Sequence, residues 1–181
     1  MTRIGFPLET ERLLIRPMEA ADAPDVHVMY GDPSAFEHIA REPAEDVDET
    51  RTRIAEKVAH QEQHGFSIWA VCERASGRVV GECGLQMLEG GPDVELGYRM
   101  SHEVRGRGLA TEAARACLIA GFDDLELERI VAVAQPENLA SRRVMKKLGM
   151  TLMGLGHHYG AETVLYAITR AQEADGGARA E

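Results

Sequence analysis

The chain has 181 residues and a formal net charge of -10 at pH 7. Hydrophobic residues make up 44% and charged residues 28%, which is ordinary for a globular domain and excludes disorder as the default. The acidic balance argues against broad binding to nucleic acid or to an anionic membrane surface, because both need a basic footprint.

Length and cysteine content bound the organisation further. We expect a single domain over residues 1–181, with a core at about 8–170 and a flexible tail at 171–181. Charges break the apolar run near the N-terminus, and no run reaches the ~18 residues of a membrane span. Cys72, Cys83 and Cys117 form no CxxC pair, which favours reduced core thiols over disulfides or a metal site. A cytoplasmic protein without a metal is expected.

The first half of the chain predicts a strand, a short helical region, a long helix and three further strands. These elements cover residues 12–18, 19–33, 46–64, 66–73, 77–88 and 93–100. On the long helix, Ile54 and Val58 occupy one apolar face, and Gly65 ends the helix. Turn-forming residues separate the three later strands, which predicts an antiparallel meander.

The second half predicts a helix, a strand, a second helix and a hairpin. They cover residues 109–122, 128–135, 136–150, 151–160 and 161–170. A strand, a helix and a nearly continuous apolar strand in this order predict a parallel crossover. In the second helix, Asn138 is the predicted N-cap and Gly149 the C-terminal glycine, with Ala140, Val144 and Leu148 at helical spacing. The predicted fold class is α+β with a mixed sheet.

A glycine-rich stretch, EVRGRGLATEAAR, lies between a predicted strand and a predicted helix. Backbone N–H groups at a helix N-terminus make an anion site, and glycines let a ligand approach the backbone. The stretch lacks the GK[ST] of a phosphate-binding Walker loop. It also lacks the third small residue of a dinucleotide fingerprint, because Thr111 stands there. The anion is therefore bound by a different kind of loop.

The remaining pattern is R-x-x-G-x-A at residues 105–110. It resembles the acyl-CoA pyrophosphate loop of the GCN5-related N-acetyltransferase (GNAT) family. VELGYRM before the loop and TEA after it stand where that family has its fourth strand and the start of a helix. The opening LETERLLIRPMEAADA is similar to the Rim-type ribosomal-protein N-terminal acetyltransferases. The resemblance covers about residues 8–170. It implies a single GNAT-like domain with a central mixed, mostly antiparallel, splayed sheet flanked by helices.

The resemblance also implies that acetyl-CoA is the cofactor. Backbone groups of the fourth strand would pair with its pantetheine arm, at Tyr98, Arg99 and Met100. Loop amides would hold the pyrophosphate, at Arg105, Gly106, Arg107, Gly108, Leu109, Ala110 and Thr111. Asn138 would contact the cofactor near its pantetheine end. Six basic residues near these positions favour an anionic ligand independently, or form a solvated face: Arg105, Arg107, Arg142, Arg143, Lys146 and Lys147.

The implied chemistry is direct attack of an amine on the thioester, which needs a base and a proton for the departing thiolate. Glu95 on the fourth strand is the first candidate base, and Glu82 is the second; each is otherwise a glutamate on a sheet surface. Many family members carry a tyrosine as the acid where this chain has Met145. The Rim-type subgroup has a serine three residues after the asparagine, and Ser141 matches it. Ser141 is otherwise a capping partner, and water could replace it as the acid.

The acceptor is less constrained by the sequence. His157, His158 and Tyr159 lie between the last two strands, where the subgroup carries a similar segment near the acceptor pocket. Trp69 and Phe66 are expected in the core. The acceptor is expected to be a protein N-terminus or a small amine, and the acidic balance favours a cationic one. A homodimer is plausible. The alternative function is a CoA-binding sensor or partner-binding domain without catalysis, which Met145 supports.

Overall fold

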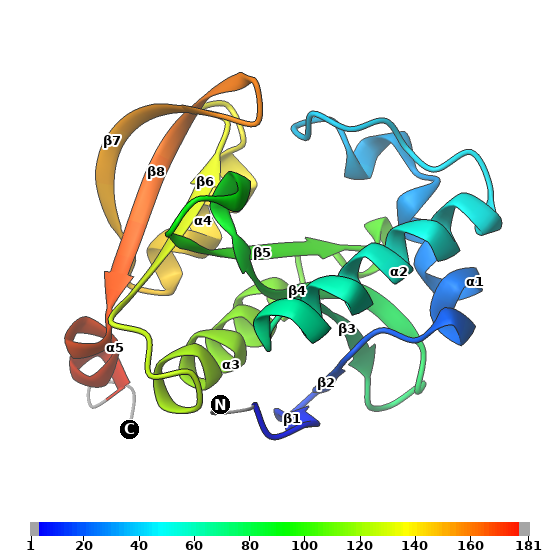
Figure 1. The fold of residues 1–181 in the computed structure, drawn as a ribbon, viewed down its shortest axis with the longest axis horizontal. Helices are drawn as coiled ribbons and strands as arrows, with labels where there is room; N and C mark the ends of the chain where they lie inside the picture. Colours follow the sequence, from blue (N-terminus) through cyan, green and yellow to red (C-terminus); the bar gives the residue numbers. More distant parts are fainter. Residues whose placement is uncertain (1–3, 178–181) are drawn as a thin grey trace.

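The central sheet of the computed structural model, which describes residues 4–177, has eight strands in the order β1-β2-β3-β4-β5-β6-β8-β7 (Figure 1). The strands are β1 (Leu8–Glu9), β2 (Leu13–Arg16), β3 (Ile68–Glu73), β4 (Val79–Met87), β5 (Val94–Met100), β6 (Arg129–Ala134), β7 (Thr151–His158) and β8 (Ala161–Thr169). Only the β5–β6 pairing is parallel. The predicted meander, parallel crossover, hairpin and α+β class are therefore confirmed.

Helices cover both faces of this sheet. They are α1 (Ala23–Tyr30), α2 (Val47–His64), α3 (Leu109–Asp123), α4 (Leu139–Lys147) and α5 (Arg170–Gly177). One face packs against α3 in a cluster that includes Trp69 and Phe66, as predicted, together with Cys83 and Cys117. The other face packs against α1 and α2, where Cys72 lies. Small side chains on α3 allow this close approach to the sheet. None of the helices in residues 4–177 is long and apolar enough to cross a membrane.

The ends of α2 follow the sequence prediction, but its apolar face does not. The Asp46 carboxylate accepts a hydrogen bond from the amide of Glu49, and Gly65 ends the helix with φ of 82°. Ile54 is buried, whereas Val58 is 37% exposed. The prediction for Val58 was wrong because the buried residues of α2 all lie in its first half, at Thr50, Arg53 and Ile54.

The α4 helix packs on the core with its predicted face except in its first turn. Asn138 caps it as predicted, and Gly149 follows it with φ of 80°. Met145 and Leu148 are buried in the core, and Val144 packs against the same cluster. Ala140 is exposed because it lies in the first turn of α4, before the part of the helix that packs on the core.

The first part of the expected tail forms a helix, α5. Thr169 donates its amide to the Oε1 atom of Gln172 at 3.0 Å, and the Nε2 atom of Gln172 reaches Thr151. These contacts start α5 directly after β8 and tie it to β7. Residues 178–181 lie outside the described residues.

The sheet opens between β5 and β6, which share a single pair, Glu95 with Val131. Beyond that pair the strands diverge, as the resemblance implied. Figure 1 shows the β7–β8 hairpin rising on one side of the opening, and the loop before α2 rising on the other. Backbone groups of β5 that face the opening are therefore not used by β6.

Candidate active site

Two cavities meet at the opening between β5 and β6. The loop groove, of about 530 Å³, lies between the 105–111 loop and α4. The inner cavity, of about 430 Å³, lies over β4 and β5, between the β7–β8 hairpin and residues 38–41. Residues common to both linings are His38, Ile39, Tyr98, Arg99, Asn138 and Ser141. The fourth-strand and α4 residues predicted for the site are thus brought together where the cavities join.

The 105–111 loop presents free backbone donors to the loop groove. Gly106 and Gly108 have φ of 77° and 81°, a conformation that side chains rarely adopt. From Gly106 to Thr111, the backbone amides donate to no protein acceptor within residues 4–177. The loop is anchored from its other side, because Arg12 donates to the carbonyl of Arg107 at 2.9 Å. The geometry is that of an anion site at a helix N-terminus.

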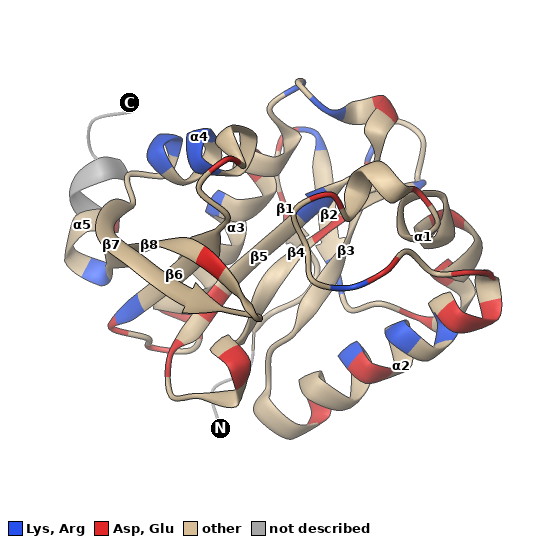
Figure 2. Cartoon of the chain, turned by 90° about the horizontal axis from the view of Figure 1, so that it is seen from above, with Lys and Arg blue, Asp and Glu red and all other residues tan. Residues whose placement is uncertain are grey.

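Half of the six predicted basic side chains line the loop groove. Arg105, Arg143 and Lys147 are among its lining residues. Arg107 instead forms an ion pair with Glu73 at 2.7 Å, and Arg142 donates to the carbonyl of Pro136. Lys146 lines neither cavity. Figure 2 shows the basic residues gathered on α4, a helix that carries no acid.

Tyr98 and the start of α4 form a polar junction between the cavities. The Asn138 Oδ1 atom accepts the amide of Ser141 at 3.0 Å, so the cap uses the backbone of Ser141 and not its hydroxyl. The phenol of Tyr98 lies 2.9 Å from both the carbonyl oxygen and the Oγ atom of Ser141. Burial raises the pKa of Tyr98, so its phenol stays protonated at neutral pH.

Glu95 is a buried carboxylate in the inner cavity, 5% exposed. It accepts hydrogen bonds from the phenol of Tyr159 and, at 3.0 Å, from Gln86. Burial raises the pKa of Glu95, and these two hydrogen bonds only partly offset the shift. A carboxylate with a raised pKa is a better proton acceptor than an ordinary one.

Glu82 is also buried, but its surroundings hold it as a charged structural group. Its carboxylate accepts a hydrogen bond from Tyr30 at 2.6 Å and lies 3.3 Å from Lys57 and 3.6 Å from Arg99. Burial acts to raise its pKa, yet the charges of Lys57 and Arg99 and the Tyr30 hydrogen bond outweigh this and lower it. Its basicity is therefore weak, which favours Glu95 over Glu82 as the base.

Replacing this buried anion is expected to destabilise the fold. Glu82→Gln leaves Lys57 and Arg99 without their counter-charge, and we expect a loss of ~3 kcal/mol in the free energy of unfolding at pH 7. Because the folded-state pKa of Glu82 is lowered, its stabilisation is present above the unfolded pKa and lost as the pH falls. Urea unfolding at pH 7 and pH 4 should show the difference shrinking. Glu103→Gln, at an exposed carboxylate, is the control; equal losses in both variants would contradict the prediction.

The structure adds site residues that the sequence analysis did not find. Residues 38–41 and Lys57 line the inner cavity, although they lie far from the loop motif in sequence. Of the three hairpin residues that the sequence analysis did expect near the acceptor, His158 and Tyr159 line this cavity and His157 does not. The Glu89 carboxylate fixes the hairpin by accepting the amide of Tyr159 at 2.8 Å. No local sequence signal marks residues 38–41, because only the path of the chain brings them to the opening.

Comparison with known proteins agrees with this geometry. Residues 12–151 match the family model described as an acetyltransferase (GNAT) domain. An uncharacterized N-acetyltransferase of Bacillus licheniformis, p20, is 30% identical over 154 residues, covering 84% of this chain and 86% of that protein.

Solved structures give the same result. An acetyltransferase (GNAT family) from Bacillus anthracis superposes with a TM-score of 0.77 at 29% identity, covering 89% of this chain and 96% of that one. RimL, a ribosomal L7/L12 α-N-protein acetyltransferase in complex with coenzyme A, superposes with a TM-score of 0.77 at 16% identity, covering 88% and 95%. At that identity the second likeness shows the shared fold alone. The chain belongs to the GNAT family of acetyltransferases, and it is an acyltransferase.

Proposed function

We propose that the protein is an acetyl-CoA-dependent N-acetyltransferase that acts on a primary amine by direct attack on the thioester. The observation that carries this proposal is the junction of the two cavities at the β5–β6 opening. The loop groove offers unused amides and cations to an anionic cofactor, and the inner cavity offers a buried carboxylate to an amine. The acceptor is a protein N-terminus or a small amine.

The residues of the loop groove fit the cofactor. Amides of the 105–111 loop would hold its pyrophosphate, assisted by Arg105, Arg143 and Lys147. The free edge of β5 at Tyr98, Arg99 and Met100 would pair with the pantetheine arm, and Asn138 would contact its end. When bound, acetyl-CoA supplies the thioester carbon that the amine attacks.

Glu95 would take the proton from the attacking amine, directly or through a water. Its carboxylate lies in the inner cavity and is held in place by Tyr159 and Gln86. Its raised pKa lies closer to neutral pH than that of an ordinary glutamate, which suits a general base. An α-amino group, with a pKa of about 8, needs less help than a lysine at about 10.4.

Ser141 would supply the proton to the departing thiolate. Many family members use a tyrosine for this step, but this chain has Met145 at that position. A carbonyl oxygen only accepts hydrogen bonds, so the Tyr98 phenol can donate to the Ser141 carbonyl. The Ser141 hydroxyl is then free to donate to the Tyr98 oxygen or to a ligand at the junction.

Removing this hydroxyl tests the assignment. Ser141→Ala keeps the Asn138 cap, because the cap uses the backbone amide. We expect kcat to fall about 100-fold, with the affinity for acetyl-CoA little changed. Ser76→Ala, in the exposed turn between β3 and β4, is the control. An unaltered rate would leave Ser141 with a capping role alone.

The function itself is tested by calorimetric titration with acetyl-CoA, followed by a free-thiol assay over N-terminal peptides and small amines. Binding together with amine-dependent thiol release is expected. Binding without release from any amine would support the second candidate, a CoA-binding sensor, which the buried Met145 favours. Absence of binding would overturn both.

A further inference from the structure

The inner cavity is lined by more cationic side chains of Lys and Arg than carboxylates. Arg41, Lys57 and Arg99 line it together with Glu82 and Glu95. The charge of Glu82 is shared between Lys57 and Arg99. Glu95 is held by hydrogen bonds from Tyr159 and Gln86. The acidic balance of the whole chain therefore does not extend to this cavity.

Arg99 has hydrogen-bonding capacity that the protein does not use. Its Nε atom is buried without a hydrogen-bond partner, 3.6 Å from Glu82. Among residues 4–177, its guanidinium donates no hydrogen bond. Its Cζ atom lies 4.2 Å from the ring centroid of Phe36, so stacking fixes the plane of the group. A fixed guanidinium with unused donors in a planar fork matches a carboxylate.

Arg99 lines both cavities, and its side chain lies on the face of β5 that also carries the candidate base. Side chains alternate along a strand, so Glu95, Gly97 and Arg99 share one face. The contacts of Arg99 are on that face, with Tyr30, Phe36 and Glu82. Tyr98 points to the other face, where it contacts α4. Arg99 therefore stands on the same surface as the candidate base, ~13 Å along the strand.

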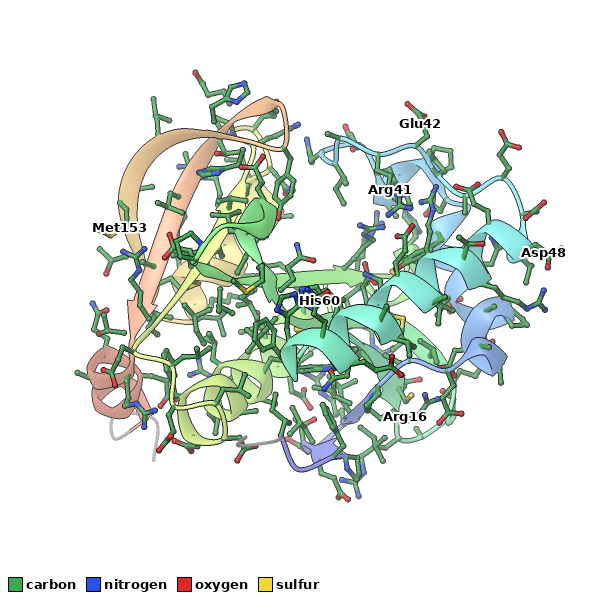
Figure 3. All side chains as sticks on the ribbon, viewed as in Figure 1. Arg16, Arg41, Glu42, Asp48, His60 and Met153 are labelled. Carbon is green, nitrogen blue, oxygen red and sulfur yellow. The ribbon has the colours of Figure 1, made fainter. Side chains whose placement is uncertain are left out.

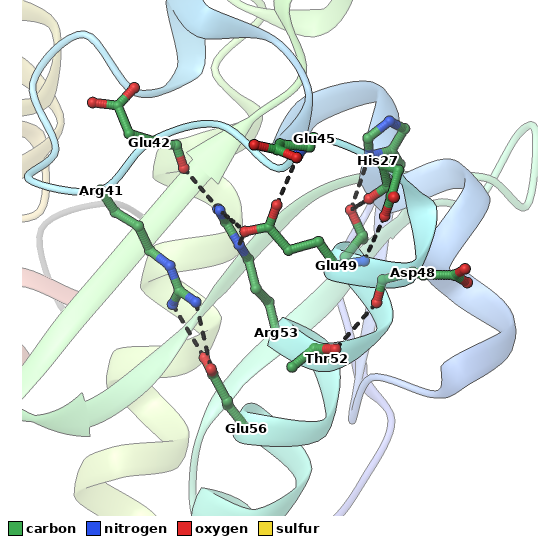
Figure 4. Close-up of polar contacts among 11 residues, drawn as sticks. His27, Arg41, Glu42, Glu45, Asp48, Glu49, Thr52, Arg53 and Glu56 are labelled. Atoms are coloured by element: carbon green, nitrogen blue, oxygen red, sulfur yellow. Dashed lines mark hydrogen bonds and ion pairs between the residues drawn. The ribbon is translucent and has the colours of Figure 1, made fainter.

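The segment before α2, which contributes Phe36 and Arg41 to the surroundings of Arg99, is held in place by contacts with α2. Arg41 pairs with Glu56 at 3.1 Å, and Arg53 donates to the carbonyl of Glu42 at 2.9 Å (Figure 4). Figure 3 shows Arg41 beside α2, across the opening from β7, where Met153 faces outward. The same loop carries Phe36. Arg41 is already hydrogen-bonded to Glu56, so Arg99 is the better candidate to bind a carboxylate in this cavity.

We propose that the acceptor is a primary amine that also carries a carboxylate, and that Arg99 binds this carboxylate. The inference rests on the proposed N-acetyltransferase function. It differs from the expectation of a cationic acceptor, because a polyamine would bring further positive charge to Arg41, Lys57 and Arg99. A free amino acid and a peptide with an acidic residue near its N-terminus offer the same chemistry.

Matched acceptors distinguish these two sources. One set pairs free amino acids with their amides, and the other pairs tripeptide amides that have Asp or Asn at the second position. Thiol release gives kcat/KM for each acceptor, and calorimetry in the presence of CoA gives affinities without turnover. For at least one set, the wild type should favour the acid roughly 10- to 100-fold.

Substitution of Arg99 should remove this preference. In Arg99→Gln the ratio of kcat/KM between acid and amide should fall to near 1. Arg99→Lys keeps a positive charge beside Glu82 and should show a reduced acid-to-amide ratio of kcat/KM that stays above 1. This variant provides the test if Arg99→Gln does not fold. Arg51→Gln, at an exposed arginine of α2 outside both cavities, should leave the ratio unchanged.

Two results would overturn the inference. One is equal affinity of the wild type for acid and amide in both sets. The other is an Arg99→Gln variant that keeps the acid preference, whether or not its acetyl-CoA binding is weakened. Both results can be read from calorimetric affinities, which need no turnover. Failure of the proposed function would appear separately, as absent acetyl-CoA binding in the wild type.

Discussion

Gly108→Glu is expected to abolish acetyl-CoA binding in a protein that still folds. Gly108 has φ of 81° and lies at the N-terminus of α3, directly beside the unused amides of the loop. A Cβ atom there would lie 3.7 Å from an Nη atom of Arg12, so the added bulk, the negative charge and the backbone strain would distort the loop whose amides are expected to hold the pyrophosphate. Calorimetric titration with acetyl-CoA should show no measurable binding.

The control for this variant must carry the same backbone strain. Gly65→Glu does so, because Gly65 has φ of 82° and lies outside both cavities. Each substitution should cost ~1–2 kcal/mol of stability. Gly65→Glu should bind acetyl-CoA as the wild type does. If Gly108→Glu folds and binds with unchanged affinity, the loop is not the cofactor site.

Glu95→Gln is expected to lower kcat about 100-fold or more. The variant keeps the size of the side chain but cannot accept a proton from the amine. A base must be deprotonated to act, so wild-type kcat/KM should fall as the pH drops through the raised pKa of Glu95. That part of the pH profile should be missing in the variant, while the limb due to the amine acceptor stays.

Stability separates this effect from a folding defect. Because the folded-state pKa of Glu95 is raised, its contribution to stability is present at low pH and lost as the pH rises through that pKa. Glu95→Gln should therefore be at least as stable as the wild type at pH 7, measured by thermal unfolding. Glu162→Gln, on the exposed surface of β8, is the activity control. An unchanged rate and pH profile in Glu95→Gln would exclude Glu95 as the base.

Much of the fold follows from local sequence. Hydrophobic periodicity predicted the meander, the crossover and the hairpin, and cap residues such as Asp46, Gly65 and Asn138 fixed the ends of helices. Local patterns fail where one helix face must be chosen. Val58 and Ala140 have the right spacing but are exposed, because each lies outside the part of its helix that packs on the core.

The candidate site divides in the same way. The R-x-x-G-x-A loop lies within a few residues of one helix start, so its glycines and amides are a property of the sequence itself. The inner cavity is built from β4, β5, α2, the β7–β8 hairpin and residues 38–41. Which charges face each other there depends on strand register, as in the pairing of Glu82 with Arg99.

The sequence by itself determined the family, the fold class and the position of the anion-binding loop, because these depend on short-range spacing and turn chemistry. Only the tertiary structure decided which partners the charged groups have. The charge of Glu82 is balanced by Lys57 and Arg99, whereas Glu95 is held by the neutral groups of Tyr159 and Gln86. Arg107 pairs with Glu73 away from the loop groove, and Arg99 keeps hydrogen-bond donors that the protein does not use. The physical reason is that a charged side chain acts through its burial and its partners, and both are set by segments distant in sequence.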